Sequence, residues 1–578
     1  MASFNLFGNS SIARTLAAGE QGFIANGATL SVLAGTAVAV AGDNVDIIVS
    51  GGIQSRDTAI NTFGYDTQIT VGPSGYITSS GFRGIDLRTQ NGSNFEIANA
   101  GLISAPGYGI GYGAANSSHA VRLNLINSGD IFGITNTAVA AYITVNSTVQ
   151  NTGTITGLAY GIDINTNANI DVWNSGTITG NAGAIALFGN DSQSDVYNSG
   201  TLNGGVFTAR GDDMLVNTGL VIGDAEFGQD QDLYDGRFGT ITGYVDGGDG
   251  DDTILGGEAD DDLRGQFGND LIRGREGDDT VTGGEGEDTL SGNDGNDSLL
   301  GDGENDTLMG GDGDDVLNGG NANDRLEGGK GADTLIGGAG DDRMEGGAGD
   351  DTMNGSSGTD TIIFPGLYTP VVVDLEAGTA TNGGDLDILF GIENVFGSAA
   401  NDTIVGSHAA SNRLEGSDGD DDIFGLDGND TILGGNDDDR LYGDNGGDRI
   451  FGGFGDDFID GGPGRDLLEG GPGADNFVFR ATSHTPVGQF LRDEVRDFDD
   501  AEGDIINLFL IDANVTAGGN QAFTVVPGFT GSPGELTLLN TVIGGQPVTI
   551  ASMDTTGNGS ANGQIYINGT LDASDFLL

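Results

Sequence analysis

The sequence predicts an all-β protein: an N-terminal parallel β-helix (a solenoid), then a parallel β-roll built from nonapeptides, then a small C-terminal β cap. Three observations predict this fold class. A loose repeat of about 24 residues fills residues 1–245, a strict repeat of nine fills most of residues 246–478, and neither repeat continues beyond residue 478. Short repeats that cannot bury an apolar face alone are typical of solenoids, in which each repeat packs on its neighbours.

The N-terminal repeat is marked by Asn-x-Gly followed by an apolar residue. Short stretches of alternating apolar residues lie between the marks, and helix formers are scarce. We expect each period to form one rung of a parallel β-helix, with the asparagines stacked from rung to rung and their side-chain amides paired. The marks are Asn99–Ile103, Asn127–Ile131, Asn151–Ile155, Asn174–Ile178, Asn198–Leu202 and Asn217–Val221.

The repeat of nine occurs in two blocks. Thirteen uninterrupted units run from Gly247 to Ile363, and seven more run from Gly416 to Val478 after an irregular insert and two poorer units, one of which contains Asp402. The expected domain organisation is therefore a solenoid at 1–245, a first β-roll at 246–363, an insert at 364–397, a second β-roll at 398–478 and a cap at 479–578.

Each fixed position of the nonapeptide has a physical cause. In all twenty units position 1 is Gly, position 6 is Asp and position 8 is apolar, and position 4 is Gly in all but four units. We expect the glycines at positions 1 and 4 to adopt backbone angles closed to other residues, so that the chain turns tightly and exposes its carbonyls. Positions 7–9 are long enough for one short strand, whose middle residue points into a narrow core. The position-4 exceptions, where the turn is least regular, are Ala259, Glu304, Ala322 and Asp437.

The excess of acidic residues indicates that the turns bind a cation. The chain has 87 acidic and 20 basic residues, which gives a formal net charge of -67. If two units form one coil, position-6 carboxylates stack at about 4.8 Å and each pair repels by roughly 3 kcal/mol at an effective dielectric of 20. A hard dication between the turns reverses that sign, and Ca²⁺ suits a site of six to eight carboxylate and carbonyl oxygens. Zn²⁺ is disfavoured because there is no cysteine and only His119, His408 and His484.

The repeats resemble the hemolysin-type calcium-binding nonapeptides of RTX proteins over residues 246 to about 478. In that family Ca²⁺ lies between the turn of one unit and the turn two units later, held by position-6 carboxylates and turn carbonyls. The resemblance implies multiple Ca²⁺ ions and these candidate ligands: Asp252, Asp261, Asp270, Asp279, Asp288, Asp297, Asp306, Asp315, Asp324, Asp333, Asp342, Asp351, Asp360, Asp421, Asp430, Asp439, Asp448, Asp457, Asp466 and Asp475.

The C-terminal segment is similar to the domain that follows the repeats in serralysin-type secreted proteins. The resemblance is carried by Phe477–Phe479, Asp497–Phe498, Gly503–Leu508 and Ile511–Ala513. The ending Asp575–Leu578 looks like the uncleaved signal that type I secretion machinery reads. No basic stretch precedes an apolar run near the N-terminus, so we expect export through this tail, a secreted or cell-surface location and repeats that fold on extracellular calcium.

Composition also limits the partners and the chemistry. So acidic a chain is not expected to bind nucleic acid, and no run approaches the roughly 18 apolar residues of a membrane span. His-Glu-x-x-His, Gly-x-Ser-x-Gly and phosphate-binding Gly-Lys-Ser/Thr motifs are absent from the sequence.

Three interpretations of residues 1–245 remain open. The favoured one is a non-catalytic adhesin, matrix or surface-layer protein that contacts extracellular glycans or a cell surface. The alternative is a polysaccharide lyase or epimerase using Asp163, Asp171 or Arg122, and the third is a passive calcium store. Trp173, Tyr160 and Phe188 are candidates for a sugar-binding strip.

Overall fold

The computed structural model describes residues 3–17, 19–33, 35–62, 66–88, 93–112, 121–190, 192–488, 492–515 and 521–578. The chain divides into two compact units, Met1–Val316 and Leu317–Leu578. This division falls inside the first block of nonapeptides, so it does not test the predicted domain boundaries. In the described residues almost all regular structure is β-strand, and no helix has the length and apolar character needed to span a bilayer.

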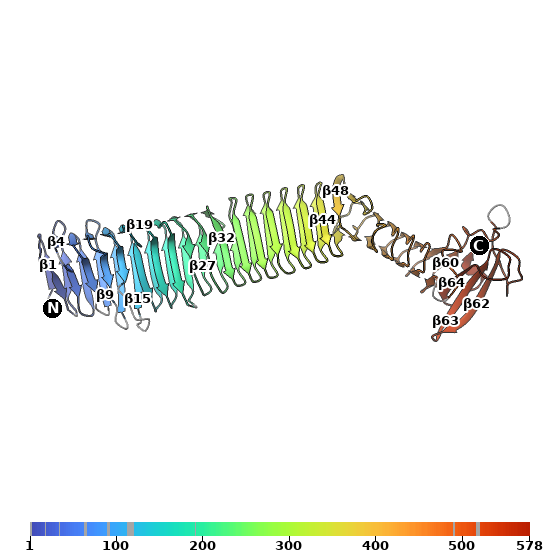
Figure 1. The fold of residues 1–578 in the computed structure, drawn as a ribbon, viewed down its shortest axis with the longest axis horizontal. Helices are drawn as coiled ribbons and strands as arrows, with labels where there is room; N and C mark the ends of the chain where they lie inside the picture. The colour runs from blue at the N-terminus through green and yellow to red at the C-terminus, as the bar shows by residue number, and fades with distance from the viewer. Residues whose placement is uncertain are drawn as a thin grey trace. The chain divides into compact units, whose positions relative to one another are not determined.

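Unit 1 begins as a parallel β-helix with three strands in each coil (Figure 1). One coil consists of β21 (Ile170–Asn174), β22 (Thr177–Thr179) and β23 (Gly183–Gly189), and the next consists of β24 (Ser194–Asn198), β25 (Thr201–Asn203) and β26 (Val206–Phe207). Each strand pairs in parallel with its counterpart one coil away. Residues alternate between the core and the outer face, so the predicted solenoid is confirmed.

The predicted asparagine ladder is also confirmed. The Nδ2 of each marked asparagine donates to the Oδ1 of the next, from Asn99 through Asn127, Asn151, Asn174 and Asn198 to Asn217, at 2.8 Å in every step. These side chains are at most 2% exposed. Pairing with each other satisfies buried amides that would otherwise each cost about 1–3 kcal/mol.

The coil narrows from three strands to two near residue 245. The sheet formed by the second strand of each coil, such as β22 and β25, ends with β28 (Leu220–Ile222) and β31 (Thr240–Ile241). Beyond it, β33 (Thr253–Leu255) pairs with β35 (Leu271–Glu276), and β34 (Asp262–Phe267) pairs with β36 (Thr280–Glu285), each offset by two nonapeptides. Position 8 of every unit points inward: Ile254, Leu263 and Ile272 are at most 1% exposed. Two units therefore make one coil of the β-roll, as the sequence predicts.

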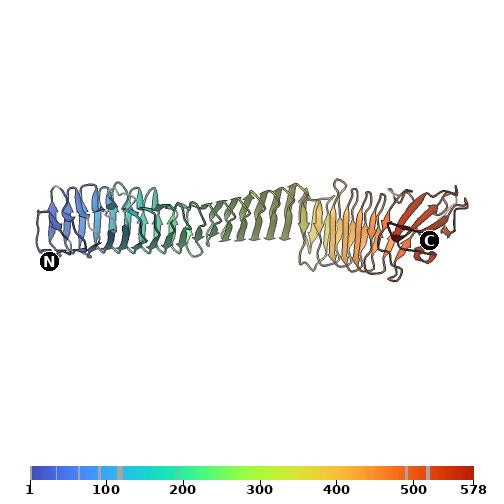
Figure 2. The ribbon, with the colours of Figure 1, turned by 90° about the horizontal axis from the view of Figure 1, so that it is seen from below.

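Unit 2 contains the remaining nonapeptides, the insert and the cap (Figure 2). The insert is not a detached loop. Its strands β46 (Val371–Asp374), β47 (Thr379–Asn382) and β48 (Asp385–Phe390) form antiparallel hairpins, while β48 pairs in parallel with β44 (Thr352–Ser357) and β46 with β50 (Thr403–Val405). The insert thus takes part in the solenoid sheet.

The cap continues the coils and closes them. β59 (Glu494–Val495) and β60 (Ile505–Asn507) pair with the last two nonapeptide strands, β57 (Leu467–Glu469) and β58 (Asn476–Val478). An antiparallel sheet of β62 (Glu535–Ile543), β63 (Gln546–Asp554) and β64 (Gly563–Asn568) follows. After a short 3-10 helix (Ala573–Asp575), β65 (Phe576–Leu577) pairs with β60, so the tail is an ordered strand of the cap.

Candidate metal centre

All twenty position-6 aspartates lie at the same place in the coil, directly before the strand of their unit. Their side chains are between 0 and 6% exposed. The Oδ1 of one aspartate accepts the backbone N–H of the position-6 residue one coil earlier, at 2.7–2.9 Å. For example, the N–H of Asp252 donates to Asp270, and the N–H of Asp439 donates to Asp457. One carboxylate oxygen is therefore used to hold the turns together.

The second carboxylate oxygen has no such use. It is buried without a hydrogen-bond partner from the protein in at least fifteen of the twenty aspartates: Asp252, Asp270, Asp279, Asp288, Asp297, Asp342, Asp351, Asp360, Asp421, Asp430, Asp439, Asp448, Asp457, Asp466 and Asp475. Asp261 differs, because its Oδ2 accepts the N–H of Gly257 at 2.8 Å. A repeated row of buried, unsatisfied carboxylate oxygens is rare in proteins and indicates a missing partner.

The Oδ2 atom of each position-6 aspartate points toward the position-1 glycine before it, as at Gly265 and Gly416. A Cβ on Gly265 would lie 2.0 Å from Asp270 Oδ2 and 2.8 Å from the carbonyl oxygen of Gly283, one coil later. The same two oxygens surround Gly416, whose Cβ would meet Asp421 Oδ2 at 2.0 Å and the Gly434 carbonyl at 2.8 Å. This donor set of carboxylate and carbonyl oxygens fits Ca²⁺. No group of three His, Cys, Asp or Glu side chains suited to a metal occurs among the described residues, so any such site needs backbone carbonyls.

The expected role of the position-1 glycine was wrong. No position-1 glycine in the described repeats has a positive φ; the left-handed residues are at positions 2 and 4. Glycine is needed at position 1 because the aspartate of its own unit occupies the space where a side chain would begin. Position 2 is left-handed even when it is not glycine, as at Gln266 (φ 83°) and Arg275 (φ 92°).

The four irregular position-4 residues divide into two kinds. Ala322 (φ 71°) and Asp437 (φ 74°) adopt the left-handed conformation that the position-4 glycine has in most units, at a cost of about 1–2 kcal/mol each. Ala259 and Glu304 do not have a positive φ. The Glu304 carboxylate instead accepts the N–H of Gly286 at 2.9 Å.

Position 5 makes a second ladder that the sequence reasoning missed. Here the backbone N–H of the later coil donates to the side-chain oxygen of the earlier one, as from Asn269 to Asp251 at 2.9 Å and from Asn296 to Asp278 at 2.9 Å. Its direction is opposite to that of position 6, and its residues are solvent-exposed. The recurrence of Asp or Asn at position 5 is the sequence signal that could have found it.

Both rows of unit 2 continue into segments that lack the repeat. The N–H groups of Asp351 and Asp360 donate to Asp387 Oδ1 (3.1 Å) and Glu393 Oε2 (2.9 Å) of the insert. At the other end the N–H groups of Asp466 and Asp475 donate to Oδ1 of Asp493 and Asp504, both at 3.0 Å. Asp402 and Asn412 of the poorer units occupy row positions too. Isolated acids without a repeat gave no signal for these positions.

Burial shifts the titration of the row strongly. Burial, with the charges of Asp252 and Asp288 adding to it, raises the pKa of Asp270 to about 8. Burial likewise raises the pKa of Asp439 and Asp448 to about 8 and that of Asp457 to about 6. Without a cation, these carboxylates therefore bind protons near neutral pH.

The candidate catalytic residues of the N-terminal solenoid do not come together. Asp163 lies on β20 (Tyr160–Thr166), in a different sheet from Asp171 on β21, and Arg122 lies on β15 (Val121–Asn127). His119 lies outside the described residues. Instead, Asp171 is paired in register with Asp195 on the neighbouring strand, and burial together with the Asp171 charge raises the pKa of Asp195.

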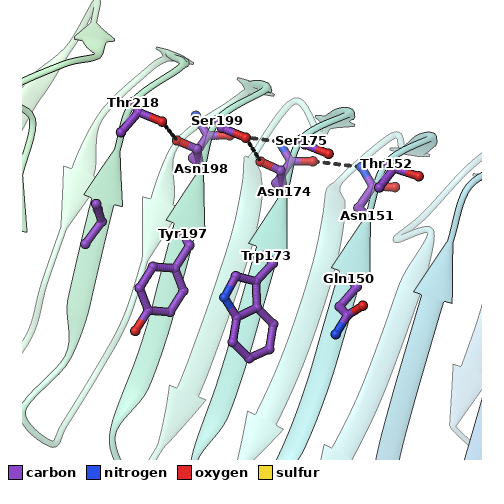
Figure 3. Close-up of a pocket in the computed structure, with 11 residues that line it drawn as sticks. Gln150, Asn151, Thr152, Trp173, Asn174, Ser175, Tyr197, Asn198, Ser199 and Thr218 are labelled. Carbon is purple, nitrogen blue, oxygen red and sulfur yellow. Dashed lines mark hydrogen bonds between the residues drawn. The ribbon is translucent and has the colours of Figure 1, made fainter.

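Beside that carboxylate pair is a shallow depression of about 480 Å³ on the outer face of the same sheet (Figure 3). Trp173 and Tyr197 form its floor, with ring centroids 5.6 Å apart and planes 6° apart, and Trp173 is 38% exposed. Hydroxyls and amides line the rest, including Gln150, Ser199 and Thr218. Figure 3 shows a broad face of each ring next to this polar row. Of the proposed strip residues, Tyr160 and Phe188 lie on another sheet.

Comparison with known families identifies the repeats. The model of the RTX calcium-binding nonapeptide repeat matches residues 244–272, 265–299, 273–308, 300–335, 327–362, 408–441, 415–450 and 442–477. The chain carries RTX repeats. Repeats of this family bind Ca²⁺ in multiple copies, so the predicted cofactor is confirmed.

Whole-chain similarity is weak. The solution structure of the AlgE6R3 subunit from the Azotobacter vinelandii mannuronan C5-epimerase is 28% identical, over 26% of this chain and 78% of that one, with a TM-score of 0.20. The crystal structure of extracellular lipase LipA from Serratia marcescens is 14% identical, over 57% of this chain and 40% of that one, with a TM-score of 0.12. These TM-scores are too low to show a shared overall fold. No curated protein matches the chain.

The position-1 glycines offer a direct test of the row. Gly265→Ala is expected to displace the Asp270 carboxylate, to lower the number of bound Ca²⁺ ions by at least one and to raise the calcium midpoint of folding several-fold. Native mass spectrometry counts the ions, and circular dichroism gives the midpoint. Gln266→Ala is the matched control, since the Gln266 side chain is exposed and donates to Asp246 instead of to a position-6 aspartate. An unchanged ion count in Gly265→Ala would show that the carboxylate does not need this space.

Proton competition gives a second test. Because the folded-state pKa values are raised, the calcium-free fold is favoured by acid and loses that stability as pH rises from about 4 to about 8. Calcium must displace those protons, so its midpoint is expected to rise as pH falls from 8 to 6, by up to tenfold per pH unit for each proton released per ion. Calcium titrations followed by circular dichroism at pH 6, 7 and 8 measure this. A midpoint that is constant across that range contradicts it.

Proposed function

We propose that this chain is a secreted calcium-binding protein whose RTX repeats fold on extracellular Ca²⁺, with the twenty position-6 aspartates as ligands. The observation that carries the proposal is the row of buried Oδ2 atoms without protein partners. Each would bind an ion together with carbonyl oxygens of the turns, such as that of Gly283 beside Asp270. The Oδ1 atoms hold neighbouring coils in register while the ions neutralise the Oδ2 side.

The same electrostatics suits export. Where free calcium is low, burying the stacked carboxylates costs free energy, either as repulsion or as proton uptake, and this keeps the repeats open, which is the state a secretion channel accepts. Where calcium is plentiful, ion binding becomes folding free energy. We propose the type I machinery as the exporter, reading the tail Asp575–Leu578. Support comes from the resemblance of that tail to such signals and from the buried rows of carboxylates of like charge.

Calcium-dependent folding can be tested with two neighbouring aspartates. With chelator, circular dichroism of the full chain is expected to show little sheet from the repeats, and millimolar Ca²⁺ to restore it cooperatively. Asp279→Asn, at position 6, is expected to raise the calcium midpoint several-fold. Asp278→Asn, at position 5 of the same turn, is the control, because neighbouring units carry Asn there, as at Asn269 and Asn296. Repeats that are fully folded in chelator, or equal effects of both changes, would refute the assignment.

For the N-terminal solenoid we propose a non-catalytic adhesive or matrix role in which the Trp173–Tyr197 depression contacts an extracellular polysaccharide. An open aromatic face packs against the C–H face of a pyranose, and the surrounding hydroxyls and amides supply hydrogen bonds. No charged residue lines the depression, and Asp171 and Asp195 lie on the same face. This arrangement favours a neutral sugar polymer over an anionic one.

A second candidate function rests on the Asp171–Asp195 pair. Two carboxylates on adjacent strands, both with a pKa raised by burial, are the elements of acid–base chemistry on a glycosidic bond. This keeps the polysaccharide-modifying enzyme as the alternative. Binding is the simpler role, because the depression is shallow and open to solvent.

A glycan array separates the two candidates. The calcium-loaded chain is expected to retain neutral polysaccharides, with Trp173→Ala lowering the affinity about 2- to 12-fold, the scale of losing one stacked aromatic contact of roughly 0.5–1.5 kcal/mol. Phe188→Ala, an exposed aromatic on another sheet, is the control. Release of shortened or epimerised product, abolished in Asp171→Asn, would favour the enzyme. Binding that is insensitive to Trp173→Ala would remove the depression from either role.

A further inference from the structure

The position-6 row of unit 1 does not begin at the repeats. Asp252, the first repeat aspartate, accepts the N–H of Asp232 at 2.7 Å; Asp232 accepts the N–H of Asp213 at 2.7 Å; and Asp213 accepts the N–H of Ser194 at 2.6 Å. These are the same bonds, with the same direction and length, that link Asp252 to Asp270. Two extra carboxylates therefore continue the row into the three-stranded coils, upstream of the first matched residue, 244.

Strand register confirms that the positions are equivalent. The residues that follow these aspartates pair in parallel: Met214 of β27 (Met214–Asn217) with Leu233 of β30 (Leu233–Asp235), and Leu233 with Thr253 of β33. Asp213, Asp232 and Asp252 thus each stand directly before a strand of one continuous sheet. Neither upstream aspartate belongs to a nonapeptide, because the steps between row members are 19 and 20 residues instead of 18.

The turn before each aspartate also has the repeat geometry. Position 4 is left-handed at Gly211 (φ 104°) and Asp230 (φ 82°), as it is at Gly250 (φ 146°). Isolated parallel bridges link position 3 of successive turns, Arg210 to Gln229 and Gln229 to Asp249. The carbonyls stack in the same way: the Asp230 oxygen faces Gly250, as the Gly250 oxygen faces Gly268.

A buried carboxylate oxygen is present at the first of these turns. Asp213 is 2% exposed, and its Oδ2 has no protein partner. The residue in register with the position-1 glycine Gly247 is Thr208, which is 7% exposed and whose hydroxyl lies beside the Asp213 carboxylate and lowers its pKa. At Asp232, which is 4% exposed, Oδ2 accepts the N–H of Gly228 at 3.3 Å, as Asp261 Oδ2 accepts that of Gly257. The first turn thus offers a hydroxyl where a repeat offers none.

We propose that Ca²⁺ also binds to the turns Arg210–Asp213 and Gly228–Asp232, through the carboxylates of Asp213 and Asp232 and the turn carbonyls, with the Thr208 hydroxyl as an added oxygen at the first turn. The proposal rests on the proposed role of the repeat aspartates, and it extends calcium binding into the three-stranded solenoid. Calcium then stabilises the junction where the coil narrows, in addition to the repeats. The ligand is a hard divalent cation, for which Tb³⁺ is an optical substitute.

Trp173 makes the site observable, because it is the only tryptophan in the chain. Asp213 lies two strands from Trp173 and three residues before the position in register with it, so the two residues are about 14 Å apart. Asp270 lies five strands from Trp173, about 26 Å away. Tb³⁺ emission excited through tryptophan at 295 nm falls steeply with distance. It therefore reports mainly on ions at the Asp213 and Asp232 turns.

The experiment uses the full-length chain titrated with Tb³⁺, and with Ca²⁺ for ion counting by native mass spectrometry. The wild type is expected to show tryptophan-sensitised emission. The double variant Asp213→Asn/Asp232→Asn is expected to lose most of that emission and one or two ions. Asp171→Asn removes one charge from the outer face of β21 and is expected to lose no ion. Asp270→Asn is expected to lose an ion but to keep the emission.

The outcomes separate the two proposals. An unchanged ion count and emission in the double variant, with an ion lost in Asp270→Asn, would overturn the junction site and leave the proposed function standing. No ion lost in any row variant would overturn both. If the double variant fails to fold by circular dichroism, the wild type alone decides, since absence of tryptophan-sensitised emission at saturating Tb³⁺ overturns the junction site.

Discussion

The structure depends on one constraint: every coil of the β-roll brings carboxylates of like charge into a buried row. One oxygen of each carboxylate is satisfied by a backbone amide of the neighbouring coil, and in most of them the other is buried without a protein partner. An ionised row without cations costs several kcal/mol per pair at this spacing, more than a marginally stable fold can supply over many coils. Protons or calcium must therefore accompany folding, and the pH and free calcium of the surrounding solution decide which.

Much of the fold could be predicted because both halves are periodic. The Asn-x-Gly marks predicted the buried amide ladder from Asn99 to Asn217, and the invariant position 8 predicted the narrow core. What failed was local: position 1 is glycine to make room for a carboxylate, a reason that depends on a contact between residues five positions apart. Asp387, Glu393, Asp493 and Asp504 were missed because single acids carry no periodic signal.

The change from three strands to two is accommodated by one large side chain. Tyr234, 2% exposed, occupies the inward register between Leu215 and Ile254, at the place where the asparagine ladder stops. Asn217, the last ladder member, donates to the carbonyl of Thr240 at 3.1 Å instead of to another asparagine. The core of the three-stranded coils thus joins the narrower core of the two-stranded coils, and the side-chain amide of Asn217 keeps a hydrogen-bond partner.

The left-handed position 2 has a consequence for how the repeats can diversify. Its side chain is outside the core and away from the carboxylates, so Gln266, Arg275 and Leu426 are all accommodated there. Position-2 residues on one edge of a block recur at the spacing of neighbouring strands, about 4.8 Å. Substitutions at position 2 can therefore place chemical groups at fixed intervals along each edge without changing the core or the position-6 row.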